Sequence, residues 1–174
     1  MAQNPVVTFT MKNGDVFKAE LYPEIAPKTV ENFLGLIENK FFDGLIFHRV
    51  IEGFMIQGGG YDETGAHKEC PSIKGEFKSN GFDNNLKHDR GVLSMARTMI
   101  KDSASSQFFI MHQAAPHLDG EYAAFGKVIE GMDVVNKIAE MPTDYMDRPL
   151  EDQVMKSVTV DTFGVDYPEP EIIE

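Results

Sequence analysis

The chain has 174 residues, of which 42% are hydrophobic and 25% charged, and these values are ordinary for one globular domain. A chain of this length can bury a sizeable core without disulfides. Its 16 basic and 28 acidic residues give a net charge of -12, which argues against nucleic acid as a partner because phosphate binding needs basic surfaces. No stretch approaches the roughly 20 apolar residues of a membrane span, so we expect no membrane partner.

Two features predict the cellular compartment. Cys70 is the single cysteine, which excludes an internal disulfide and fits a reducing environment. Residues 1–5 lack the basic and apolar regions that are typical of a signal peptide. We therefore expect a cytoplasmic protein.

The N-terminal segment has the pattern of a β-hairpin. Apolar and polar residues alternate over 7–11 and again over 17–21, which predicts two strands. Asn13 and Gly14 lie between them, and this pair is typical of a two-residue primed turn because both of its central residues need positive φ.

A helix is expected next. Pro27 is placed to begin it, because the fixed φ of proline suits the first helical turn, and Asn39 and Gly44 lie where it would end. Its apolar positions recur with helical spacing, so they fall on one face. These positions are Val30, Phe33, Leu34 and Ile37.

An arginine among large apolar residues marks the following segment. Alternation over 45–50 and over 54–58 predicts two strands that are interrupted at Gly53. Glycine within a strand pattern indicates a bend, a bulge or the close approach of another backbone. The guanidinium of Arg49 either faces an apolar hollow or extends over the core edge to pair with a carboxylate.

The rest of the chain alternates between loops and short regular elements. Residues 61–87 are polar and rich in glycine, which is typical of loops with short extended pieces. The acidic, proline-containing tail at 166–174 is expected to be mobile. The other expected elements are strands at 91–96, 107–112, 123–128 and 157–163, a loop at 101–105 and a short helix at 132–139.

Many short strands with only two helices favour a mainly β fold, in which an antiparallel sheet closes on itself. The chain has no internal repeat and no linker. We therefore expect one domain over 1–174, with its core at about 6–163.

Five segments together resemble the cyclophilin family of peptidyl-prolyl cis-trans isomerases, and they occur in the order typical of that family. Residues 95–98 read Met-Ala-Arg-Thr, a form similar to cytosolic bacterial members in particular. The resemblance implies a closed eight-stranded antiparallel β-barrel capped at each end by a helix, with a packed interior and a site on its outer face. The five segments are 47–60, 94–98, 105–110, 118–120 and 125–128.

The resemblance also implies which residues form the site. Arg49 would donate a hydrogen bond to the substrate, and Gln57 would orient Arg49 and bond the substrate backbone. Arg97 would pair with an extended peptide through its backbone. Apart from the resemblance, we expect the charge of its guanidinium to add a preference for acidic substrate residues. His48 would belong to the substrate-binding set and order the local network. The other substrate-binding positions would be Phe54, Met55, Ala96, Gln107, Phe109, His117, Leu118 and Tyr122.

These residue types suit rotation about an X-Pro peptide bond, whose barrier of roughly 18–20 kcal/mol reflects partial double-bond character. A planar amide is more polar than a twisted one, so an apolar pocket disfavours the planar state relative to water. A cationic donor can bond the nitrogen lone pair that the twisted amide regains, or hold the prolyl carbonyl. Neither device needs a metal or a cofactor, and we expect none.

Other interpretations stay open. Phe54, Met55 and Phe109 suit a core as well as a pocket, Gln57 suits a polar surface, and Leu118 suits a loop anchor. Two rival functions are a proline-peptide binding or chaperone module with negligible turnover, and a barrel that carries a small apolar ligand inside. An isomerase assay separates these possibilities.

The chain departs from the family's pattern at two positions. His117 stands where many members carry tryptophan, and Tyr122 stands where many carry histidine. We therefore expect cyclosporin binding to be weak, whereas short X-Pro substrates should still be turned over. The expected partners are proline-containing peptides and folding proteins, and we expect a monomer.

Overall fold

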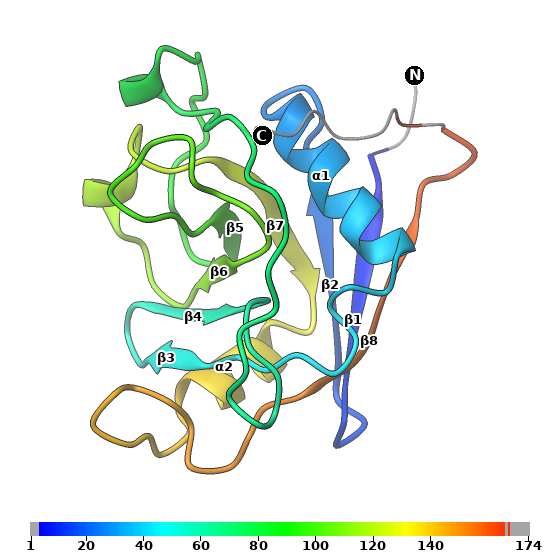
Figure 1. Ribbon diagram of the computed structural model, residues 1–174, viewed down its shortest axis with the longest axis vertical. Coiled ribbons are helices and arrows are strands. Elements are labelled where there is room, and N and C mark those ends of the chain that lie inside the picture. The colour runs from blue at the N-terminus through cyan, green and yellow to red at the C-terminus, as the bar shows by residue number, and fades with distance from the viewer. Residues whose placement is uncertain (1–3, 166, 168–174) are drawn as a thin grey trace.

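The computed structural model describes residues 4–165 and 167, and it has a mainly β fold (Figure 1). Eight strands form one antiparallel sheet in the order β3-β4-β6-β5-β7-β2-β1-β8, which curls into a barrel. The expected fold class is therefore confirmed. The tail predicted to be mobile lies outside the described residues, apart from Tyr167. The strands are β1 (Val6–Met11), β2 (Val16–Leu21), β3 (Arg49–Ile51), β4 (Met55–Gly58), β5 (Val92–Met95), β6 (Phe108–Met111), β7 (Ala124–Glu130) and β8 (Met155–Asp161).

Two α-helices accompany the sheet, and both lie where the sequence predicts them: α1 (Pro27–Glu38) and α2 (Met132–Ala139). α1 packs beside β8, whereas α2 packs beside β2, β3 and β4, so the helices cover different parts of the barrel (Figure 1). Two short 3-10 helices, η1 (Lys78–Asn80) and η2 (Pro116–Leu118), lie in connecting segments. Within the described ranges, no helix is both long and apolar enough to cross a membrane.

The N-terminal hairpin is confirmed, but its turn has three residues rather than the expected two. The Met11 N–H donates to the Asp15 carbonyl at 2.8 Å, and the Gly14 N–H donates to the Met11 carbonyl at 2.9 Å. Gly14 has a φ of +95°, whereas Asn13 does not have a positive φ. A primed two-residue turn needs positive φ at both central positions, so a three-residue loop with glycine in the left-handed conformation forms instead.

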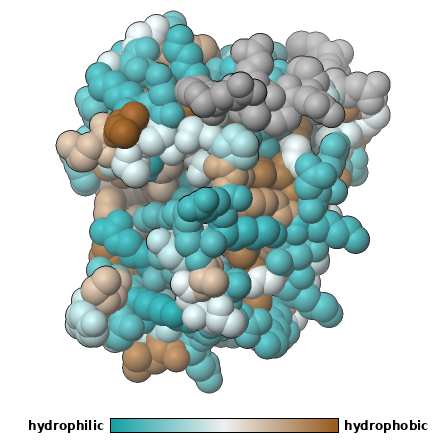
Figure 2. Space-filling view, in the orientation of Figure 1, coloured by the Kyte–Doolittle hydropathy of each residue, from teal (hydrophilic) through white to brown (hydrophobic). Residues whose placement is uncertain are grey.

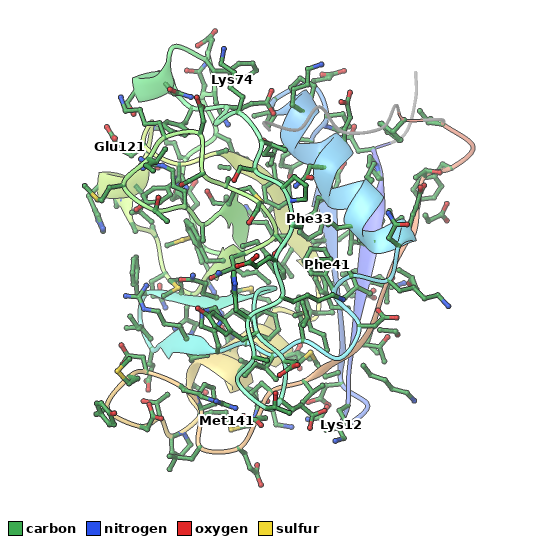
Figure 3. The ribbon with its side chains drawn as sticks, viewed as in Figure 1. Lys12, Phe33, Phe41, Lys74, Glu121 and Met141 are labelled. Carbon is green, nitrogen blue, oxygen red and sulfur yellow. The ribbon has the colours of Figure 1, made fainter. Side chains whose placement is uncertain are left out.

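The barrel interior is a packed core. The ring of Phe108 lies at its centre, with ring-centroid distances of 5.8 Å to Phe9, 5.2 Å to Phe33, 5.5 Å to Phe42 and 6.0 Å to Phe47. All five side chains are fully buried, and the one from α1, Phe33, points toward the strands (Figure 3). Because rings fill the interior, the rival interpretation of a barrel with an internal ligand is wrong.

The barrel closes between β3 and β8 without a continuous ladder. Ile46 and Val154 form an isolated antiparallel bridge, and the Phe47 N–H donates to the Gln153 carbonyl at 3.0 Å. These bonds occupy the backbone before β3, so the strand expected over 45–50 begins only at Arg49 and ends at Ile51.

Glycines bring the end of β4 against the segment that leads into β6. A Cβ on Gly59 would lie 2.7 Å from the Ser106 carbonyl oxygen, and one on Gly60 would lie 2.5 Å from the side chain of Gln107. The bare backbone therefore lets Gln107 lie beside β4. Gly53, by contrast, has open space around it and a φ of +79°, so it serves the tight turn between β3 and β4.

The outer surface contrasts with this core. The face in Figure 2 is mostly hydrophilic, and its apolar residues form small separate groups. This surface agrees with a chain that carries 28 acidic and 16 basic residues.

Candidate active site

A row of paired residues crosses one side of the sheet. Arg49 of β3 pairs with Gln57 of β4, Gln57 pairs with Phe109 of β6, and Phe109 pairs with Ser94 of β5. Residues directly opposite each other in a ladder point to the same face, while their sequence neighbours point to the other. The neighbouring Phe108 lies in the barrel core, so this row faces outward.

A hollow of about 160 Å³ opens over this row. Its floor belongs to an apolar cluster outside the barrel that is separate from the interior core and includes Met55, Phe109 and Leu118. Alternation along β4 and β6 therefore supplies two cores, one inside the barrel and one beneath the hollow. The hollow is lined by Arg49, Phe54, Met55, Gln57, Ala96, Arg97, Phe109, Leu118 and Tyr122.

A chain of polar side chains fixes one edge of the hollow. The exposed Arg49 donates from Nη1 to Gln57 Oε1 at 3.4 Å, and Gln57 Nε2 donates to Gln107 Oε1 at 3.0 Å. Gln107 thereby sets the orientation of the Gln57 amide, which presents its oxygen to the guanidinium. Within the part of the chain that the structure describes, four of the five N–H donors of Arg49 are left for another acceptor.

Apolar side chains form both the floor and the wall opposite this edge. The ring of Phe109 meets that of Tyr122 edge to face, with centroids 5.6 Å apart and an interplanar angle of 86°. Met55, Phe109 and Leu118 are 2%, 5% and 8% exposed, so they keep only a small surface toward solvent. Such a wall binds an apolar ring and excludes water from one side of it.

A second groove adjoins the hollow. It has a volume of about 250 Å³ and shares Gln57, Ala96 and Arg97 with the hollow, while Gln107 lies in the groove rather than in the hollow. Among the described residues, the backbone N–H and C=O of Arg97 have no hydrogen-bond partner. Both groups are therefore available to an extended peptide.

One residue beneath the hollow was missed by the sequence analysis. His88 is 1% exposed, its Nδ1 lies 3.1 Å from Asp119 Oδ1, and its Nε2 lies 2.8 Å from Ser94 Oγ. A carboxylate only accepts, so Nδ1 carries the proton and Nε2 accepts from the Ser94 hydroxyl. The imidazole also stacks on Phe109, with centroids 5.9 Å apart and an interplanar angle of 20°.

His88 supports the wall as a neutral ring. Burial lowers its pKa below the ordinary histidine value, although the hydrogen bond and charge of Asp119 act in the opposite direction. The ring joins β5 to the loop of Leu118 and Asp119 beneath Phe109. No local signal marks it, because its partners lie 6 and 31 residues away in the sequence.

The structure places His48 away from the hollow. Its ring packs against that of Tyr61 in a tilted arrangement, with centroids 4.5 Å apart and an interplanar angle of 56°, and its buried Nδ1 lacks a hydrogen-bond partner among the described residues. Burial, reinforced by the charge of Arg49, lowers the pKa of His48 to about 4. At neutral pH this ring is therefore uncharged and contributes to packing behind Arg49.

His117 lies at the rim. It is exposed on η2, and its ring stacks on Phe54 with centroids 6.0 Å apart and an interplanar angle of 27°. The ring is not among those that line the hollow, so it extends the apolar surface of Phe54 outward.

The described part of the chain contains no group of three or more His, Cys, Asp or Glu side chains placed to hold a metal ion. The site instead combines an apolar hollow, a cation fixed at its edge and an unpaired stretch of backbone beside it. Such an arrangement can hold a small ring in the hollow and direct N–H donors at a polar group attached to that ring.

Comparison with known protein families agrees with this geometry. The family model described as "Cyclophilin type peptidyl-prolyl cis-trans isomerase/CLD" matches residues 6–160. The chain is 42% identical over 156 residues to "Peptidyl-prolyl cis-trans isomerase-like 3" of Gallus gallus, covering 88% of this chain and 94% of that one. It is 43% identical over 155 residues to "Peptidyl-prolyl cis-trans isomerase CYP18-1" of Arabidopsis thaliana, covering 88% of this chain and 94% of the relative.

A third relative, "Peptidyl-prolyl cis-trans isomerase-like 2" of Rhizopus delemar, is 46% identical over 140 residues, which cover 80% of this chain and 26% of that protein. The chain thus spans about a quarter of the length of the isomerase-like 2 proteins. The comparisons therefore confirm the predicted family. These relatives are eukaryotic, so they do not support a particular similarity to bacterial members.

Solved structures show the same fold. A cyclophilin type peptidyl-prolyl cis-trans isomerase of Cryptosporidium parvum superposes with a TM-score of 0.77 at 31% identity, covering 91% of this chain and 98% of that one. A second crystal structure of that protein was determined in the presence of the dipeptide Ala-Pro, and it superposes with a TM-score of 0.76 at 32% identity, covering 90% of this chain and 98% of that one.

Proposed function

Because the chain belongs to the family of cyclophilin-type peptidyl-prolyl cis-trans isomerases, we propose that it accelerates rotation about X-Pro peptide bonds, with Arg49 as the catalytic donor. The observation that carries the proposal is the Arg49 guanidinium, held by Gln57 at the edge of an apolar hollow. The prolyl ring of the substrate occupies the hollow, and the dipeptide Ala-Pro is the smallest probe that contains the bond. The substrates are proline-containing peptides and folding proteins.

The hollow acts on the relative free energies of the planar and twisted amide. Phe109, Met55 and Leu118 surround the prolyl ring with carbon, so the planar amide loses more solvation than the less polar twisted amide does. In water, uncatalysed exchange takes tens to hundreds of seconds. Only an interaction that is stronger in the twisted state shortens this time.

Arg49 supplies that interaction. A guanidinium keeps its charge at neutral pH and offers donors in a rigid fork, which can bond the nitrogen lone pair of the twisted amide or hold the prolyl carbonyl. Gln57 limits the rotation of the fork, and Gln107 limits the rotation of Gln57. The backbone of Arg97 holds one flank of the peptide as an added strand, so that the other side of the bond can turn.

The test is a coupled assay on a short Ala-Pro peptide. A charge-assisted hydrogen bond contributes about 1.5–3 kcal/mol, so Arg49→Ala should lower kcat/KM roughly 10- to 150-fold. Arg49→Lys should recover only part of this loss, because an ammonium lacks the planar fork. Arg90→Ala is the matched control, since Arg90 is exposed and bonds Asn136 of α2, outside the lining of the hollow.

A proline-peptide binding or chaperone module is the second candidate, because the hollow and the unpaired backbone alone would hold such a peptide. Binding does not require the cationic donor at the edge of the hollow, and this favours the isomerase. Equal rates for wild type and Arg49→Ala, with both variants still binding the peptide, would move the conclusion to the binding module.

Several finer proposals accompany the activity. We propose a monomer in a reducing, cytoplasmic environment, supported by the single cysteine Cys70. We propose weak cyclosporin binding on the basis of His117 at the rim. Similarity to cytosolic bacterial members is supported only by the segment 95–98.

A further inference from the structure

The side chain of Arg97 has an arrangement that its proposed backbone role does not need. Its Nε and Nη2 both donate to the Glu121 carbonyl, at 3.1 and 2.6 Å, and its Nη1 donates to the Thr98 carbonyl at 3.0 Å. Its Cζ lies 4.7 Å from the ring centroid of Phe77 and 4.7 Å from that of Tyr122. The guanidinium is therefore fixed by two aromatic rings and two carbonyl groups from three segments of the chain.

These contacts hold the charge of Arg97 in place without neutralising it. All of its hydrogen-bond acceptors are carbonyl oxygens, and no carboxylate within the described residues lies close enough to form an ion pair with it. Three of the five N–H donors are used, so two remain. Glu121 contributes its carbonyl, and it lies at the edge of the molecule away from α1 (Figure 3).

The surroundings of Arg97 are unusual for this protein. Arg97 lines both the hollow and the adjoining groove, Arg49 lines the hollow and His67 lines the groove. Among the described residues, neither lining contains an aspartate or a glutamate, although the chain has 28 of them and a net charge of -12. The two arginine charges, in a concave surface whose lining lacks acidic groups, focus a positive potential there.

We propose that Arg97 is a specificity-determining residue that selects X-Pro substrates with a carboxylate side chain on the flank of the proline that crosses the groove. The proposal rests on the proposed function and names its substrate class. The hollow and the groove share Gln57, Ala96 and Arg97, so a peptide whose prolyl ring fills the hollow has a continuous path for one flank over these residues. A carboxylate on that flank meets a guanidinium that is already ordered, so little side-chain entropy is lost when the pair forms.

Arg97 also supports the wall of the hollow. Its contact with Tyr122, and the edge-to-face contact of Tyr122 with Phe109, connect the groove to the prolyl pocket through touching rings. A substitution that removes the charge but keeps an apolar chain preserves most of this packing. Arg97→Met is such a substitution, and Arg97→Lys keeps the charge but loses the planar stacking.

The experiment compares matched peptides that differ by one charge: Glu-Pro against Gln-Pro, and Pro-Glu against Pro-Gln. Exposed ion pairs are weak, so in wild type the ratio of kcat/KM for Glu to Gln should be about two to five on one flank only. Screening should bring this ratio to about one near 1 M salt, where the Debye length is about 3 Å. A ratio at or below one on both flanks, or equal preference on both flanks, would overturn the proposal.

Variants assign the preference to Arg97. The ratio should fall to about one in Arg97→Met and persist in part in Arg97→Lys. Arg90→Met removes one exposed positive charge that does not line the groove, and it should keep the wild-type ratio. An unchanged ratio in Arg97→Met would contradict the proposal.

A failure of the proposed isomerase function can be distinguished from a failure of the proposed selectivity. If no peptide is turned over, the Kd values of the Glu and Gln peptides are measured by titration, and their ratio replaces the ratio of kcat/KM. A Kd preference for the carboxylate that disappears in Arg97→Met would support the selectivity even without catalysis. Equal Kd values of wild type for the Glu and Gln peptides would contradict the proposed selectivity.

Discussion

Two arginines at one site use their guanidinium groups in different ways. Among the described residues, Arg49 makes a single hydrogen bond, at 3.4 Å to Gln57, and its exposed guanidinium keeps most of its donors free. Arg97 makes three hydrogen bonds to carbonyl groups and lies against two rings, so it is fixed in place. The first arrangement suits a donor that forms its strongest bond in the transition state, and the second suits a static recognition element.

The lowered pKa of His48 predicts how stability changes with pH. Its folded-state pKa is about 4, against about 6.5 in the unfolded chain, so between these values the unfolded state binds more protons. Its contribution to the free energy of unfolding is therefore complete above about pH 6.5 and is lost as the pH falls toward 4. Between pH 7.5 and 5 the loss should be about 1–2 kcal/mol, measured by urea unfolding.

A pair of histidine variants isolates this effect. His48→Gln removes one of the two buried histidines with a lowered pKa and should reduce the pH dependence in this window, leaving the part that belongs to His88. His67→Gln removes an exposed imidazole that contacts Tyr61, and it should keep most of this dependence, because the charge of His67 is the smallest of the causes that lower the pKa of His48. Parallel pH profiles for wild type and His48→Gln would show that His48 is not the source.

His117 at the rim predicts the response to cyclosporin. The family's drug binding draws on an indole at this position, with a large apolar face and one N–H donor, whereas His117 offers a smaller ring stacked on Phe54. We expect affinity lower by one to two powers of ten, or about 1.4–2.8 kcal/mol, and His117→Trp should restore much of it. Peptide kcat/KM should change far less than drug affinity in the same variant. Equal drug affinity for wild type and His117→Trp would contradict this explanation.

At the scale of elements, sequence patterns predict the type of a secondary-structure element better than they predict its boundaries. The spacing of Val30, Phe33 and Ile37 predicts α1, and these residues are buried. The strand expected at 45–50 is shorter because alternation does not reveal which backbone groups bond to the seam with β8. Local periodicity in the sequence does not show which distant segments bond to each other.

α1 offers a test of one such partnership. Its N-cap is Ala26, which has no side-chain cap, and the buried Glu76 supplies one instead. Glu76 Oε1 accepts from the Thr29 N–H at 2.6 Å and from Thr29 Oγ1 at 2.8 Å, and its charge suits the positive end of the helix. Glu76→Ala leaves that N–H buried and unpaired, so the free energy of unfolding should fall by about 1–3 kcal/mol.

Urea unfolding of the Glu76 variants measures this contribution. Glu76→Gln keeps an acceptor but loses the charge, so its stability should lie between those of Glu76→Ala and wild type. Ser79→Ala, which removes an exposed hydroxyl from the same connecting segment, is the control. Wild-type stability in Glu76→Ala would show that the cap contributes nothing.

At the scale of the whole molecule, the site depends on two apolar cores, one inside the barrel and one outside it beneath the hollow. β6 sends Phe108 inward and Phe109 outward, so the hollow rests on the same sheet that encloses the interior core. The family resemblance predicts the outward set from short motifs. It does not reveal the support given by His88, Ser94 and Asp119, because only the folded chain joins them.

The central claim is that Arg49 acts on the twisted amide rather than on binding alone. The most direct measurement is NMR exchange spectroscopy of one Ala-Pro peptide at saturating concentrations of wild type and of Arg49→Ala, which gives the cis–trans rate constant of the bound peptide together with Kd. We predict that the bound-state rate constant falls roughly 10- to 150-fold in Arg49→Ala while Kd changes less. A bound-state rate constant that is the same in both proteins, with a weaker Kd in the variant, would contradict the account.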